Sequence, residues 1–75
     1  MISPNPFDDI LIAQFPEGQD FPVDLILMHT ENQKRFHDRI FTSKKIIDVV
    51  DLPSGLYRFT LKQDDRIIDE GYLRK

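Results

Sequence analysis

Apolar and polar residues alternate along most of this 75-residue chain. The pattern is clearest at 56–63. There Tyr57, Phe59 and Leu61 would face one side of a strand, and Arg58, Thr60 and Lys62 the other. A period of two is typical of a β-strand that buries one face. Residues 22–29 repeat it, and we expect Val23, Leu25 and Leu27 to face the core there.

Four further segments have a strand pattern, namely 9–14, 34–41, 45–50 and 66–74. The segment 31–41 contains some helix formers, but its apolar residues do not make a helical face, so it too is predicted as a strand. Turns are expected at 15–20, 30–33, 51–55 and 64–65. We expect left-handed geometry at Asn32, and Asp64 and Asp65 favour a tight turn.

Six or seven short strands joined by turns predict an all-β fold, a small immunoglobulin-like antiparallel β-sandwich. The chain is too short for more than one domain. We expect a Pro-rich lead-in at 1–7 and the sandwich at 8–75. Because no cysteine can crosslink so small a core, we expect a stability of only about 3–5 kcal/mol.

Charge is unevenly distributed along the chain. Residues 1–32 carry six acidic and no basic side chains, whereas 33–75 carry ten basic and seven acidic ones, for a net charge of −3. Either uneven solvation of two edges or a docking surface explains this asymmetry. A pI near 5.1 argues against a nucleic-acid partner.

The sequence shows neither the pattern of a membrane span nor that of an N-terminal signal peptide. No apolar run is long enough to span a membrane. Met1-Ile2-Ser3 has none of the features of a signal peptide, so we expect that this chain alone could not enter a secretion route by its N-terminus.

Candidate catalytic residues are few. His29 and His37 are the only histidines, and without cysteine they fit no recognised metal-binding spacing, so we expect each on a strand face or end. No serine lies in a G-x-S-x-G motif. Neighbouring carboxylates such as Asp8-Asp9 point to opposite faces of a strand and cannot act as an acid/base pair. We therefore expect no enzymatic activity, no metal and no cofactor.

Three short motifs stand in a definite order. They are Pro4-Asn5-Pro6-Phe7 near the start, Leu52-Pro53-Ser54-Gly55-Leu56-Tyr57 in the second half, and Tyr72-Leu73-Arg74-Lys75 at the end. Each alone is a weak signal, because a Pro-rich stretch or an L-x-x-G-x-Y corner fits many β-sandwiches. Gly55 is expected at a positive φ in that corner.

In this order and separation, the motifs resemble the type A C-terminal sorting domain of the type IX secretion system of Bacteroidetes. The resemblance covers nearly the whole chain. Phe7, Leu11 and Ala13 match the Phe and the alternating apolar residues that follow the family's Pro-Asn-Pro lead. Residues 47–57 match its Ile-Asp-Val/Leu-x-x-Leu-x-x-Gly-x-Tyr stretch. The chain departs from the family where Glu31-Asn32-Gln33 replaces a glycine turn, and its tail is less rich in lysine.

The resemblance implies a secretion signal rather than a catalyst. Such a domain directs an upstream cargo domain through the outer-membrane translocon and is then removed by a sortase-like peptidase. The chain would be exported, in the periplasm in transit and then at the cell surface or secreted. The residues implied for translocon recognition are Pro4, Asn5, Pro6, Gly55, Tyr57, Tyr72, Leu73, Arg74 and Lys75.

Two strands have apolar residues on both faces. Ile10 and Ile12 alternate with Leu11 and Ala13, and Ile26 and Met28 with the core residues of 22–29. Either these four residues form a docking patch or the loop 15–21 covers one set. An alternative function is that of a non-catalytic immunoglobulin-like accessory or binding module in a surface or secreted protein.

Overall fold

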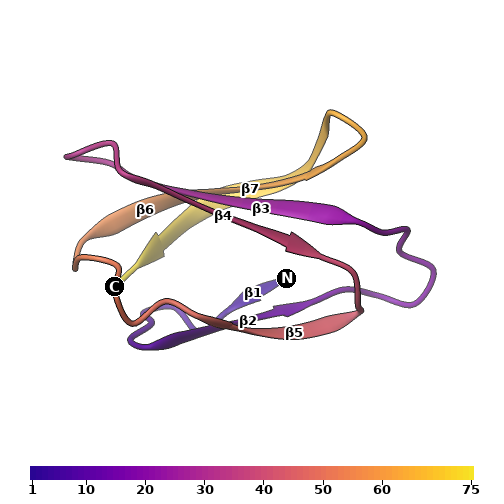
Figure 1. Ribbon diagram of the computed structural model, residues 1–75, viewed down its shortest axis with the longest axis horizontal. Helices are drawn as coiled ribbons and strands as arrows, with labels where there is room; N and C mark the ends of the chain where they lie inside the picture. The colour runs from indigo at the N-terminus through magenta and orange to yellow at the C-terminus, as the bar shows by residue number, and fades with distance from the viewer.

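The alternating segments form two antiparallel sheets in the computed structural model, which describes residues 1–75 (Figure 1). The strands are β1 (Ile2–Ser3), β2 (Ile10–Gln14), β3 (Val23–His29), β4 (Arg35–Ile40), β5 (Lys44–Asp48), β6 (Leu56–Gln63) and β7 (Arg66–Arg74). One sheet has the order β1-β2-β5 and the other β4-β3-β6-β7. The predicted all-β sandwich is confirmed.

The strand order is that of an immunoglobulin-like sandwich. The chain changes sheet between β2 and β3, between β4 and β5, and between β5 and β6. Non-consecutive strands therefore become neighbours, β2 with β5 and β3 with β6, as in Greek-key folds. These crossings bring the chain's end next to its beginning.

The core lies between the two sheets and contains 13 buried apolar residues. The face predictions for β3 and β6 are confirmed, since Val23, Leu25, Leu27, Tyr57 and Leu61 are all buried. Phe59 is only partly buried. Its ring covers Gly71 on β7, where an added Cβ would lie 2.8 Å from the ring.

One turn has the predicted residues in left-handed geometry and another does not. Asp64 and Asp65 have φ of 51° and 65°, as a two-residue hairpin turn with positive φ at both positions requires. In the β3–β4 turn, the prediction for Asn32 is wrong, because Gln33 takes the positive φ of 60°. The Asn32 side chain instead accepts a hydrogen bond from Lys34 N at 2.8 Å.

The lead-in is not separate from the sandwich. β1 lies within 1–7 and pairs with β2, and Ile2 and Phe7 are 9% and 2% exposed. Residues 1–7 therefore contribute a strand and two core residues to the sandwich. The sequence pattern did not predict this short strand, because Pro4 and Pro6 interrupt the alternation of apolar and polar residues.

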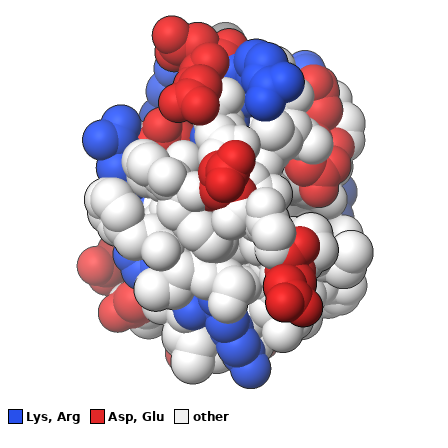
Figure 2. All heavy atoms as spheres, turned by 90° about the vertical axis from the view of Figure 1, so that its right-hand side faces the viewer, with Lys and Arg blue, Asp and Glu red and all other residues white.

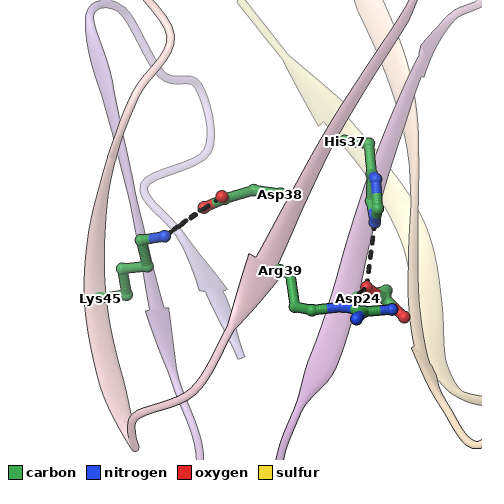
Figure 3. Close-up of polar contacts among 5 residues, drawn as sticks. All are labelled: Asp24, His37, Asp38, Arg39 and Lys45. Atoms are coloured by element: carbon green, nitrogen blue, oxygen red, sulfur yellow. Dashed lines mark hydrogen bonds and ion pairs between the residues drawn. The ribbon is translucent and has the colours of Figure 1, made fainter.

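Ion pairs link β4 to its surroundings (Figure 3). On the outer face, Asp24 accepts hydrogen bonds from Arg39 Nε and binds His37 Nε2, each at 3.0 Å. The Arg39 guanidinium, and then His37, lower the pKa of Asp24 below its ordinary value. Between the sheets, Lys45 Nζ lies 2.9 Å from Asp38 and joins β5 to β4 at the open edge of the sandwich.

Candidate functional site at the end where the motifs meet

The Pro-rich lead-in lies against the end of β7. Asn5 Oδ1 accepts a hydrogen bond from Arg74 N at 3.0 Å, and Asn5 Nδ2 donates one to Tyr72 O at 3.3 Å. Phe7 N donates to Arg74 O at 2.8 Å. The lead-in thus pairs with β2 of one sheet through β1 and holds β7 of the other sheet through Asn5 and Phe7.

The corner between β5 and β6 holds the last residue of the chain (Figure 1). Gly55 and Lys75 exchange two backbone hydrogen bonds of 3.0 and 2.8 Å. Lys75 Nζ donates to the carbonyl oxygens of Val49, Val50 and Leu52 at 2.6, 3.2 and 2.7 Å. All three sequence motifs therefore meet at one end of the sandwich.

Tyr57 occupies the interior of this end and is 1% exposed. Its hydroxyl donates to Pro53 O at 2.5 Å, the arrangement known as a tyrosine corner. Its ring lies 6.0 Å from Phe7 and 5.0 Å from His29, measured between centroids. Burial raises the pKa of the Tyr57 hydroxyl, because the phenolate would lose its hydration there.

His29, at the end of β3, joins two turns. Its Nε2 lies 2.9 Å from Ser54 O, and its Nδ1 accepts from Glu31 N and Asn32 N at 3.2 and 3.3 Å. This pattern assigns the proton to Nε2, because Nδ1 faces only donors. The expected place on a strand face or end is confirmed, and the role of this buried imidazole is structural.

Gly55 has the positive φ that its motif predicted, 139°. A Cβ at this position would lie 2.4 Å from His29 Nε2. Glycine is therefore required here for two reasons, the backbone angle and the contact with the imidazole. The spacing of the motif revealed the first reason but not the second.

The residues implied for recognition divide into two groups. Pro4, Asn5, Pro6, Tyr72 and Arg74 are exposed, and a partner can contact them. Gly55, Tyr57, Leu73 and Lys75 are buried or partly buried and hold this end together. While the domain is folded, a partner cannot contact a buried ring such as that of Tyr57.

Arg74 and Lys75, the two basic residues implied for recognition, do not form a free end. The Lys75 ammonium is occupied by three carbonyl oxygens, which leaves Arg74 as the exposed cation of the tail. The sequence near Lys75 does not predict these hydrogen bonds, because the carbonyl groups belong to a corner more than 20 residues upstream.

The expected docking patch is divided between the two outer faces. Ile10 and Ile12 lie on the three-stranded sheet, and Ile26 and Met28 on the four-stranded sheet. In the loop 15–21, Phe15 and Phe21 contact each other edge to face and pack against the core. Ile46, which is 62% exposed and pairs with Ile12, belongs beside them and was missed.

The opposite end of the molecule has a different surface. Figure 2 shows mostly uncharged atoms there, with acidic and basic side chains mainly around them. A hollow of about 230 Å³ is lined by residues that include Met1, Phe15, Pro16 and Ile68.

No group of three or more His, Cys, Asp or Glu side chains is arranged to hold a metal ion. None of the structure forms a helix suited to crossing a membrane. Comparisons with protein-family models, curated proteins and solved structures found no match.

Proposed function

We propose that this domain is a C-terminal secretion signal of the type IX system, recognised as a folded surface. The observation that carries the proposal is the meeting of the lead-in, the corner and the tail at one end. Three motifs separated by up to 69 residues are joined there by direct hydrogen bonds. The same three motifs carry the resemblance to sorting domains.

The recognition surface consists of Pro4, Asn5, Pro6, Tyr72 and Arg74. The side chain of Tyr72 is largely free, with 56% of the residue exposed. Because Asn5 binds the backbone at Tyr72 and Arg74, these residues form one surface only in the folded domain. The partners are the outer-membrane translocon and its sortase-like peptidase, and the domain serves as their substrate without chemistry of its own.

A reporter fusion tests the proposal. Residues 1–75 are placed behind a periplasm-directed reporter in a bacterium that has the type IX machinery. We expect the reporter at the cell surface or in the medium. Retention in the periplasm, in cells that export a native cargo normally, would overturn the proposal and favour an immunoglobulin-like binding module.

Point substitutions separate recognition from folding. Asn5→Ala removes both hydrogen bonds to β7 and should reduce export, whereas Thr42→Ala removes one comparable bond, to Lys44 O, away from the motif end. Arg74→Glu should also reduce export, with Arg66→Glu as its control on β7. Deleting 72–75 is less informative, because Leu73 is buried and its loss would unfold the domain. Equal export by variant and control would contradict the recognition surface.

A further inference from the structure

The outer face of the four-stranded sheet carries a groove with an apolar floor and basic sides. The groove holds about 300 Å³ and is lined by Ile26, Met28, Arg35, Arg58, Thr60, Lys62 and Ile67. The strand register places Met28 between Arg35 and Arg58, and Ile67 beside Lys62. We call this surface the basic face.

Two of its cations are uncompensated within the chain. Arg58 pairs with Glu70 at 2.6 Å, and Arg39 on the same face pairs with Asp24. Arg35 and Lys62 make no ion pair. The groove therefore combines apolar side chains with free positive charge, which suits an acidic and apolar surface.

The outer face of the three-stranded sheet is such a surface. Ile12 and Ile46 pair across β2 and β5, and Ile10 lies opposite Asp48. Ile10 and Ile46 are 43% and 62% exposed. Three further exposed carboxylates lie near Asp48 at the same end of the sheet, those of Asp8, Asp9 and Asp51. The one cation that β5 adds to this face, Lys44, lies at the other end of the strand, opposite Gln14. We call this surface the acidic face.

We propose that the acidic face of one copy binds the basic face of a second copy, head to tail. The two faces lie on opposite sides of one sandwich, so a single domain cannot join them to each other. Stacking two copies places sheet on sheet, the packing that already forms the core. Since the surfaces differ, the contact is heterologous and leaves one face of each kind open on a pair.

The size of the faces sets the strength of the contact. Both faces lie along the longest and shortest axes of the molecule, whose extents of 34 and 16 Å limit the area of each face (Figure 1). Complete overlap would bury at most about 500 Å² on each copy, which is less than the roughly 800 Å² per partner of a stable interface. We therefore expect weak association, in the high micromolar to millimolar range, that weakens as salt is added.

Sedimentation velocity of the isolated domain over that range provides the first test. We expect the weight-average sedimentation coefficient to rise with concentration and to fall back in high salt. A chain that stays monomeric throughout would overturn the proposal and leave each face open to a different partner.

Variants on each face make the test specific. Ile46→Lys places a cation on the acidic face, and Arg35→Glu with Lys62→Glu reverses the basic face. Each variant alone should associate about tenfold more weakly than the parent. Mixed together they should form a pair that grows no further, because each supplies the one intact face that the other lacks.

Matched controls lie outside both faces. Phe41→Lys, at a residue 64% exposed in the β4–β5 turn, controls for Ile46→Lys. Lys34→Glu with Arg66→Glu makes the same charge change as the basic-face variant. A mixture that stays monomeric, or controls that weaken association as much as the face variants do, would contradict head-to-tail binding.

Discussion

The Tyr57 hydroxyl reaches back four residues along the chain and donates a hydrogen bond to the Pro53 carbonyl oxygen. This bond closes the corner through which the chain passes from β5 to β6. The tyrosine ring at the same time packs against Phe7 of the lead-in and His29 of β3. One side chain therefore joins the corner motif to the lead-in motif.

Tyr57→Phe removes this bond and should lower the free energy of unfolding by about 1–2 kcal/mol near neutral pH. The difference in stability between wild type and variant should shrink at alkaline pH. Burial raises the pKa of Tyr57 in the folded state, so the unfolded chain loses the phenolic proton first. This contribution to stability is complete below about pH 10 and is lost as pH rises from there toward the folded pKa. Urea titrations should show a steeper alkaline loss in the wild type than in Tyr57→Phe, and equal slopes would contradict it.

Gly55→Ala should be much more destabilising than Gly18→Ala. Both glycines have positive φ, 139° and 90°, so both substitutions strain the backbone. Only Gly55 has a neighbour in the way, since a Cβ at Gly18 would meet nothing within 4 Å. We expect a difference of at least about 2 kcal/mol in thermal or urea melts. A Gly55→Ala variant as stable as Gly18→Ala would show that His29 moves aside without cost.

Lys75→Met should destabilise the domain by about 1–3 kcal/mol, because three carbonyl oxygens lose a charged donor. Arg74→Met should change stability by less than about 0.5 kcal/mol, since its side chain is exposed. The comparison tests whether Lys75 supports the fold while Arg74 does not. Equal melting temperatures for the two variants would contradict a supporting role for Lys75.

Asp24→Asn should lower stability at neutral pH and have no effect in strong acid. Arg39 and His37 lower the pKa of Asp24 in the folded state, so its contribution is present above about pH 4. It is lost as pH falls through the folded pKa, because wild type and variant then both carry an uncharged group. Urea titrations at several pH values should show the difference close toward pH 2, and a difference that stays constant would contradict this assignment.

Local pattern was enough to predict most strands and their buried faces. Val23, Leu25 and Leu27 alternate without interruption, and the structure buries all three. The hairpin at Asp64-Asp65 followed from residue type alone, because two carboxylates in a row favour left-handed geometry. These features depend on residues that are close together in the sequence, and the period of the apolar residues is enough to predict them.

Features that depend on distant partners were beyond such a pattern. Nothing near Lys75 shows that its ammonium meets carbonyl groups of the corner. Nothing near Ile12 shows that it pairs with Ile46 rather than with a residue of β3. The candidate site was therefore predicted as a set of motifs, but the division into exposed residues and supporting residues required the structure.

The bonds of Asn5 also set an order of events during synthesis. Its partners at Tyr72 and Arg74 are the last part of the sandwich to be made, so Asn5 has no β7 backbone to bind while the ribosome adds the residues between. At about 5–20 residues per second, that interval lasts several seconds. The motif end therefore stays open on every growing chain and closes only when translation has passed residue 74.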